Sequence, residues 1–220
     1  MQKNLNNFLI FNILDLIEEI GEERLQTILS DFSCPPNKEV EYFLHRKAIE
    51  FAKDGVSVTY LVFLDSDDTM DLVGYFTINI KNFEIDTRKL SRTLKKSILH
   101  FAGYKNDGDK KIMLPAHLIA QLGKNYTQCR NKLIKGDDLM FMAIKKVEDS
   151  QRGIGGRLCY LECENKNILM AFYQQHGFVE FNRRKLTEAE LKRSTTDEYV
   201  QMLRYRKIPK KVSTIKIVTK

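Results

Sequence analysis

The chain has 220 residues, 43% of them hydrophobic and 30% charged, as in ordinary globular proteins. That length suits one large domain with a sizeable core. No apolar run approaches the length of a membrane span, and Asn12 and Asp15 interrupt the apolar N-terminal stretch, which lacks a basic start. We therefore expect neither a membrane protein nor a signal peptide.

The cysteines and the charges narrow the function classes further. Four cysteines without a secretion signal predict reduced thiols in a cytoplasmic protein, and their spacing, with scattered histidines, predicts no metal site. The net charge of +7 equals the charge of residues 204–220, which carry seven cations and no acid. Such basic tails are usually solvated extensions. The alternative is a contact with phosphates, as on RNA.

The first half of the chain is predicted to begin with helices and continue with a β-hairpin. Residues 1–33 are expected to form two short helices separated by Gly21, since their apolar residues fall on one face. Asn37 is placed as the N-cap of the amphipathic helix that follows and that ends at Asp54-Gly55. The strands 56–64 and 71–85 then pair around an acidic turn.

Three further features are expected before residue 125. Gly74 in the second hairpin strand indicates a bulge or the close approach of another backbone. A basic helix follows over residues 87–102, and its charged face is either solvated or borders a phosphate-bearing substrate. Residues 112–122 form the next strand, in which Pro115 favours a bulge or an edge position.

Residues 157–181, RLCYLECENKNILMAFYQQHGFVEF, contain a strand, a helix, a tight turn and a second strand. The strand is a short apolar run, and an Asn in Glu164-Asn165-Lys166-Asn167 is placed to cap the helix. Gly177 ends that helix in the left-handed conformation. A polar helix over residues 187–193 and a last strand over 199–206 complete the sheet.

The pair Phe172-Tyr173, with Tyr173 four residues before Gly177-Phe178, resembles a segment of GNAT-type acyl-CoA N-acyltransferases. The resemblance implies an α/β (α+β) GNAT fold, with a mixed, mostly antiparallel central sheet flanked by helices and with splayed central strands. It covers residues 32–207, which leaves 1–31 as an N-terminal helical extension and 208–220 as a basic tail. An upstream series is similar to the opening of the subgroup that includes tRNA-acetylating toxins: Phe32, Cys34, Glu39, Glu41, Phe43, Leu44, Thr59 and Tyr60.

The resemblance also implies an activity and a site. Tyr173 matches the tyrosine that protonates the departing coenzyme A thiolate, and the alternative is an amphipathic core residue. Leu122, Gly123 and Lys124 would offer backbone groups to the pantetheine arm of acetyl-CoA. Asn167, at the start of the next helix, is included with the cofactor-binding residues.

The pyrophosphate is expected at residues 125–136, before a helix over 137–151. Gly136 fits the last small position of the family's glycine-rich motif, whereas Asn131 and Ile134 depart from it. Three cations, Arg130, Lys132 and Lys135, are expected to compensate for these two departures by pairing with the phosphates. Asp137 and Asp138 interact favourably with the helix dipole but would repel a nearby pyrophosphate. The alternative loop, Gly153–Gly156, leaves too few residues for the elements that follow, so it is interpreted as a helix stop and a turn.

The expected function is transfer of an acetyl group from acetyl-CoA to a primary amine. Two alternatives stay open: acetylation of aminoacyl-tRNA, with the basic tail and the basic helix contacting RNA, and a catalytically inactive binding protein of the same fold. No carboxylate is obviously placed as a general base, and His117 and Gln121 lie near the expected site. A homodimer is compatible with the sequence, and no membrane partner is expected.

Overall fold

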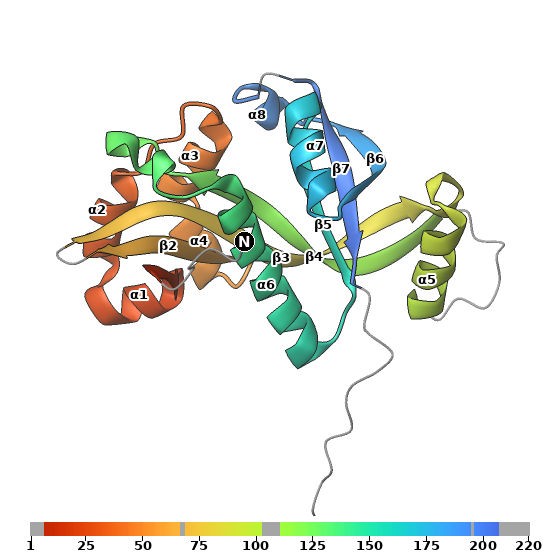
Figure 1. Ribbon diagram of the computed structural model, residues 1–220, viewed down its shortest axis with the longest axis horizontal. Helices are drawn as coiled ribbons and strands as arrows, with labels where there is room; N and C mark the ends of the chain where they lie inside the picture. Colours follow the sequence, from red (N-terminus) through yellow and green to blue (C-terminus); the bar gives the residue numbers. More distant parts are fainter. Residues whose placement is uncertain (1–6, 67–68, 103–110, 195, 207–220) are drawn as a thin grey trace, which may run out of the picture.

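A computed structural model describes residues 7–66, 69–102, 111–194 and 196–206 of the chain (Figure 1). Its strands are β1 (Phe8–Asn12), β2 (Val58–Ser66), β3 (Thr69–Asp86), β4 (Lys111–Lys124), β5 (Leu158–Glu164), β6 (Val179–Lys185) and β7 (Glu198–Tyr205). Its helices are α1 (Ile13–Ile20), α2 (Glu22–Ser30), α3 (Lys38–Arg46), α4 (Ala48–Lys53), α5 (Arg92–Ala102), α6 (Gly136–Ile154), α7 (Asn167–Gln175) and α8 (Glu188–Leu191). The described residues also include two short 3₁₀ helices, η2 (Thr87–Lys89) and η3 (Thr127–Lys132).

The strands form one sheet in the order β1-β2-β3-β4-β5-β7-β6. Every neighbouring pair is antiparallel except β4 and β5, which are parallel. The mixed, mostly antiparallel sheet flanked by helices is the one that the sequence predicted. Within the described part of the chain, no helix is long and apolar enough to cross a membrane.

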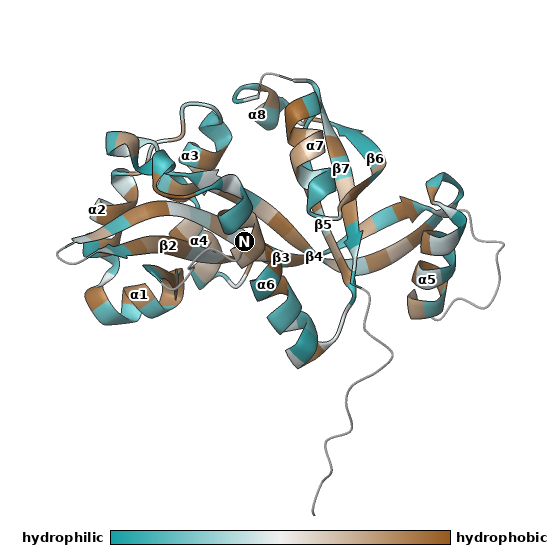
Figure 2. Ribbon diagram, viewed as in Figure 1, coloured by the Kyte–Doolittle hydropathy of each residue, from teal (hydrophilic) through white to brown (hydrophobic). Residues whose placement is uncertain are grey.

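Helices cover the sheet on both faces. On one face, α6 and α7 enclose the first core cluster, which includes Phe76, Leu139 and Leu161. The opposite face carries two clusters: one beneath α1–α4 around Leu61 and Tyr75, the other beside α5 around Phe83 and Tyr160. Figure 1 shows α1–α4 at one end of the sheet, α5 at the other and α6 across the middle. In Figure 2 the strands are mostly brown and the outer side of α6 is teal, as this arrangement requires.

Local signals account for several element boundaries. The Asn37 side chain accepts hydrogen bonds from the backbone N–H groups of Glu39 (3.1 Å) and Val40 (3.3 Å), which confirms it as the N-cap of α3. The predicted amphipathic helix is interrupted at Lys47, where φ of −127° separates α3 from α4. Gly177 has φ of 84° after α7, and the N–H of Phe178 donates to the carbonyl of Tyr173, as in a left-handed C-cap.

The N-terminal segment differs from the prediction. Residues 8–12 are not helical: they form the edge strand β1, which pairs with β2 from Phe8↔Leu64 to Asn12↔Tyr60. A short apolar run is equally compatible with a helix and with a strand. Here the segment is a strand because it pairs with the edge of β2. Two helices follow, and Ile13 is buried in the cluster that also contains Leu61. The domain boundary at residue 31 stays a prediction, and the predicted tail 208–220 lies outside the described residues.

The hairpin and the next strand agree with the sequence. The register of β2 and β3 shifts from Val62↔Gly74 to Phe63↔Leu72, so Gly74 lies at a bulge. A Cβ on Gly74 would also lie 2.8 Å from the carbonyl oxygen of Gly123, so both expectations for this glycine are confirmed. Pro115 lies in the part of β4 that has no β5 partner, an edge position as predicted.

Candidate active site

The central feature of the candidate site is a gap between the two parallel strands. β4 and β5 pair at His117↔Cys159, Leu118↔Tyr160 and Ile119↔Leu161, whereas β4 continues to Lys124 and β5 to Glu164. Both strands are described throughout, so the pairing ends well before either strand does. Backbone groups on the facing edges of this splayed region are therefore available to a ligand.

A bulge in β4 lies at the start of the gap. Ile119 pairs with Ile78 and Gln121 pairs with Thr77, which leaves Ala120 as the extra residue. Bulges bend a strand and re-aim its backbone groups and side chains. Because opposed residues share a face, Gln121 points with Thr77 away from α6, whereas Ile119 points with Ile78 toward α6.

The beginning of α6 lies against α7 on one side of the gap. A Cβ on Gly136 would lie 3.3 Å from Cε2 of Phe172, so a small residue allows the two helices to approach closely here. Asp137 accepts hydrogen bonds from Gln175 Nε2 (2.9 Å) and His176 Nε2 (3.0 Å). Of the two carboxylates that were expected to disfavour a pyrophosphate, that of Asp137 is therefore bonded by the end of α7, and that of Asp138 accepts from the N–H of Lys135 (3.4 Å).

Tyr173 lies on α7 beside the same gap. Its ring packs against the first core cluster and makes edge contacts with the rings of Phe172 (5.1 Å) and Phe178 (6.3 Å). Burial raises the pKa of the Tyr173 phenol well above its usual value, and the neighbouring Cys163 raises it further. The side chain is half-buried, and within the described residues its hydroxyl has no hydrogen-bond partner. The phenol is thus protonated at neutral pH and has a proton to give.

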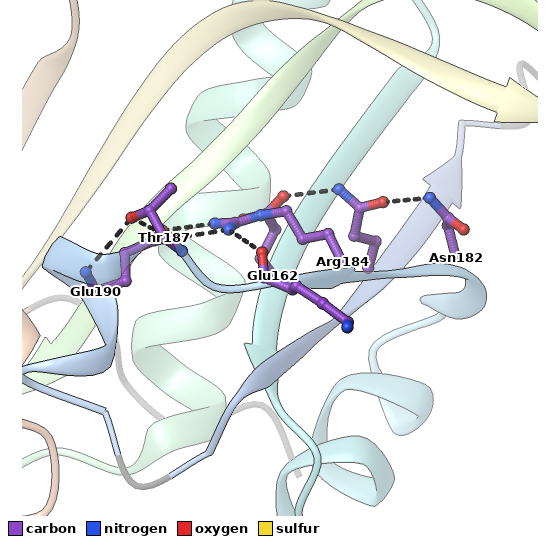
Figure 3. A network of polar contacts seen from close by, with 7 residues as sticks. Glu162, Asn182, Arg184, Thr187 and Glu190 are labelled. Carbon is purple, nitrogen blue, oxygen red and sulfur yellow. Dashed lines mark hydrogen bonds and ion pairs between the residues drawn. The ribbon is translucent and has the colours of Figure 1, made fainter.

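The face opposite α6 and α7 carries a polar network beyond the gap (Figure 3). Arg184 of β6 donates from Nε to Oε2 of Glu162 (2.7 Å) and from Nη1 and Nη2 to Glu190 (2.9 and 2.7 Å). Gln201 donates to Oε1 of Glu162 (2.7 Å), and Asn182 donates to Gln201 (2.9 Å). Arg184 holds the pKa of the Glu190 carboxyl low, at about 2.

The predicted pantetheine-binding residues lie at the end of β4. Leu122 is half-buried against the first core cluster. Gly123 is buried and faces α3, where an added Cβ would overlap Cγ1 of Val40. Lys124 donates from Nζ to the carbonyls of Asn131 (3.0 Å) and Ile134 (3.4 Å), so its side chain holds the following loop. Their backbone groups follow the gap, as the assignment requires.

The predicted phosphate-binding cations are not all placed alike. Lys132 and Lys135 are exposed just before α6. Arg130 instead pairs with Asp71 of β3 (2.9 Å) and with Asp31, which follows α2, and it also donates to Gln128 of η3 (3.1 Å). The structure therefore brings the two lysines to the start of α6 and turns the Arg130 guanidinium toward carboxylates.

Two expectations about side chains near the site are wrong. Asn167 is exposed in the first turn of α7 and does not cap it: the N-cap is Lys166, and no side chain caps this end. His117 lies away from the gap, buried between β4 and the end of α6, with Nε2 2.9 Å from Oγ of Ser150. Burial lowers the pKa of His117, so it is a neutral, structural histidine.

The interpretation of Gly153–Gly156 as a helix stop and a turn is confirmed. α6 ends at Ile154, and both Gly155 (φ 91°) and Gly156 (φ 97°) adopt the left-handed region that favours glycine. Ile134, at the position of the family's middle glycine, is buried in the first core cluster. Among the described residues, no group of three or more potential metal ligands comes together.

Sequence reasoning missed two residues at the site. Asn125 is buried after β4: its Oδ1 accepts from the N–H groups of Ser33 (3.1 Å) and Thr127 (3.0 Å), and its Nδ2 donates to Leu72 (2.9 Å). Glu162 was read as part of a short apolar strand. The signal for it was present, because Glu162 and Glu164 alternate with apolar residues and indicate a strand with one polar face.

Comparison with known proteins gives a likeness in structure only. No protein-family model matches the sequence, and no curated protein matches it. A tyrosine-to-phenylalanine mutant of KacT is similar to this chain, with a TM-score of 0.57 and 15% identity over 88% of this chain and 94% of that one. AtaT complexed with acetyl-methionyl-tRNAfMet has a TM-score of 0.56 and 15% identity over 88% of this chain and 93% of that one.

A third similar structure is that of AtaTR bound with acetyl-CoA, with a TM-score of 0.52 and 13% identity over 89% of this chain and 93% of that one. Identities this low establish the fold alone. The chain has the GNAT fold, as its sequence predicted.

Proposed function

We propose that this chain transfers the acetyl group of acetyl-CoA to a primary amine by direct attack. The observation that carries the proposal is the position of Tyr173 beside the gap between β4 and β5. The side chain is half-buried, and its protonated hydroxyl has no hydrogen-bond partner among the described residues, so it is free to donate to a leaving group.

The residues on the α6 side of the gap are suited to binding acetyl-CoA, the acetyl donor. The first N–H groups of α6 have no partner within the helix, and they lie beside the exposed Lys132 and Lys135. Gly136 itself adds no side chain at these N–H groups, and the partners of Asp137 on α7 draw its carboxylate aside, whereas the Asp138 carboxylate accepts from the N–H of Lys135 (3.4 Å). The backbone of Leu122, Gly123 and Lys124 would bind the pantetheine arm. In this proposal Arg130 takes no part.

The chain's own groups then act on the two substrates. Backbone N–H groups at the β4 bulge polarise the thioester carbonyl, and the amine attacks its carbon. As the C–S bond breaks, Tyr173 gives its proton to the sulfur, and it regains one from solvent. The likeness to AtaTR bound with acetyl-CoA supports this choice of donor.

An amine carried on RNA is a second candidate acceptor, and one contact favours it. Lys89 of η2 donates to Asn182 (3.3 Å), so the basic start of α5 adjoins the polar network on the face opposite α6. Exposed Arg92 and Lys96 continue the positive surface along α5. AtaT, similar in fold, is known in complex with an acetylated aminoacyl-tRNA. RNA contact by the C-terminal tail, a homodimer and a cytoplasmic location stay predictions.

Radiolabelled acetyl-CoA tests the proposed function. We expect label to pass to an α-amine, supplied either as amino-acid amides or as bulk aminoacyl-tRNA. Transfer to the tRNA alone, with a rate that falls steeply as salt rises, would identify the RNA-borne amine. Transfer to the amides at an equal rate would identify a small acceptor. Absence of transfer to either substrate would overturn the proposal.

A further inference from the structure

A strip of polar side chains crosses the sheet on the face opposite α6 and α7. It takes one residue from each of β2, β3, β4, β5 and β7, and these are Thr59, Thr77, Gln121, Glu162 and Gln201. Their registers, Thr59↔Thr77, Thr77↔Gln121 and Glu162↔Gln201, place the members on one face. The strip separates the apolar cluster beneath α1–α4 from the one beside α5. Polar groups in such a position cost stability unless they are bonded.

One part of this strip is hydrogen-bonded within the sheet, and another part lies beside the gap. The hydroxyls of Thr59 and Thr77 bond each other at 2.8 Å. Glu162, by contrast, is the first residue of β5 beyond the last pair with β4, Ile119↔Leu161. It points with Tyr160 away from the first core cluster, whereas Leu161 and Cys163 point into it, toward α7. Glu162 and Tyr173 therefore approach the gap from opposite faces.

The Glu162 carboxylate is held firmly and keeps a free acceptor site. Arg184 contacts Oε2 from Nε (2.7 Å) and Nη2 (2.5 Å), and Gln201 donates one hydrogen bond to Oε1 (2.7 Å). A carboxylate has about four lone-pair sites, so one site on Oε1 remains. The side chain also retains 19% exposure. Charge-assisted contacts of this kind fix a carboxylate in one position.

We propose that Glu162 binds the attacking amine and takes up the positive charge that develops on its nitrogen. This inference rests on the acetyl transfer proposed above. One N–H of the neutral amine donates to Oε1, which turns the nitrogen lone pair toward the gap. As the C–N bond forms and the C–S bond breaks, the nitrogen becomes cationic beside the carboxylate. It loses a proton to Glu162 and so to solvent, while Tyr173 protonates the thiolate.

Two neighbouring glutamates fit this role less well. Glu164 lies at the end of β5 and is paired with Lys166 at 2.5 Å. Glu190 lies on α8, where Arg184 and the N–H and hydroxyl of Thr187 occupy it. Glu162 is therefore the carboxylate of this face that follows the last β4 pair directly.

The test compares Glu162→Gln with Glu180→Gln. Glu180 is also a β-strand glutamate paired with an arginine (Arg183, 2.8 Å), and it lies on the other face of the sheet. Acetyl-CoA binding is measured by calorimetry, and transfer is measured with amino-acid amides and bulk aminoacyl-tRNA. We expect kcat/KM for the amine to fall by about 10²-fold or more in Glu162→Gln, with the Kd for acetyl-CoA unchanged. Glu180→Gln should match the wild type.

The outcomes separate this inference from the proposed function. Equal transfer by Glu162→Gln and wild type would overturn the role of Glu162 and leave acetyl transfer standing, as would a loss seen in Glu164→Gln instead. A wild type that binds acetyl-CoA without transferring its acetyl group would overturn both. If Glu162→Gln does not fold, Glu162→Asp replaces it. That variant keeps the charge but withdraws the carboxylate, so it should fold, bind acetyl-CoA and lose transfer.

Discussion

Replacing Tyr173 with Phe removes one oxygen atom and tests the acid step in isolation. The Tyr173 hydroxyl makes no hydrogen bond within the described structure, so its removal breaks no hydrogen bond. Loss of an unpaired hydroxyl from this half-buried side chain should leave the free energy of unfolding unchanged or raise it by up to about 1 kcal/mol. General acid catalysis contributes about 10²–10⁴-fold, so kcat should fall by that factor. The Kd for acetyl-CoA should stay the same.

The pH dependence follows from the direction of the Tyr173 pKa. Burial raises that pKa above its value in the unfolded chain, which is about 10. The protonated phenol therefore contributes to stability in full below pH ~10, and this contribution is lost as pH rises further. The Phe variant lacks the group, so the wild type should lose more stability than the variant above pH ~10. Below that pH the wild-type rate should show no decline caused by ionisation of Tyr173.

The assay follows release of coenzyme A by mass spectrometry under single-turnover conditions. Tyr60→Phe is the matched control, because Tyr60 packs against the same core cluster, stacked on Phe76 at 5.2 Å, and burial also raises its pKa. The control should retain wild-type turnover. Equal turnover by Tyr173→Phe and the wild type would refute the general-acid assignment.

Two further predictions concern stability. Gly123→Ala should destabilise the protein by about 1–3 kcal/mol in chemical denaturation, because the new Cβ would overlap Val40 of α3. Gly153→Ala in α6 is the control: nothing lies within 4 Å of its new Cβ, so it should stabilise the protein by about 0.5–1 kcal/mol. Equal effects of the two substitutions would contradict the packing argument. Glu190→Gln should lose about 1–2 kcal/mol at pH 7, since Arg184 keeps the pKa of Glu190 at about 2 and the pair is partly exposed. That difference should disappear as pH falls from about 4 toward 2, and a difference that persists at pH 2 would show that the charge is not its source.

Most of the fold could be predicted because its signals are local. Asn37 and Gly177 mark helix ends by their own chemistry, and alternation identified the β2–β3 hairpin. Residues 8–12 could not be assigned in this way, because their strand exists only through pairing with β2. The cap of α7 was also mispredicted, since Asn167 lies one residue inside the helix.

In the candidate site, too, the features set by local sequence signals could be predicted, and those set by contacts between distant residues could not. The helix that carries Tyr173 and the strand end at Gly123 follow from sequence periodicity and from resemblance to a known family. The partners of Arg130, by contrast, are Asp31 and Asp71, which are distant in sequence and adjacent only in the folded chain. The contact between Glu162 and Arg184 likewise joins two strands across the sheet. Ion pairs between residues so far apart in the chain produce no periodic pattern in a single sequence, so they could not be predicted from it.

The most direct test of the central claim is calorimetric titration of acetyl-CoA into the wild type and Gly136→Glu. Gly136→Gln is the matched control, since it adds similar bulk beside Phe172 without a charge at the start of α6. The account predicts that the wild type binds, that the Glu variant does not, and that the Gln variant binds more tightly than the Glu variant. Equal binding by Gly136→Glu and the wild type would show that the pyrophosphate lies elsewhere. Failure of the wild type to bind would contradict acetyl-CoA as the donor.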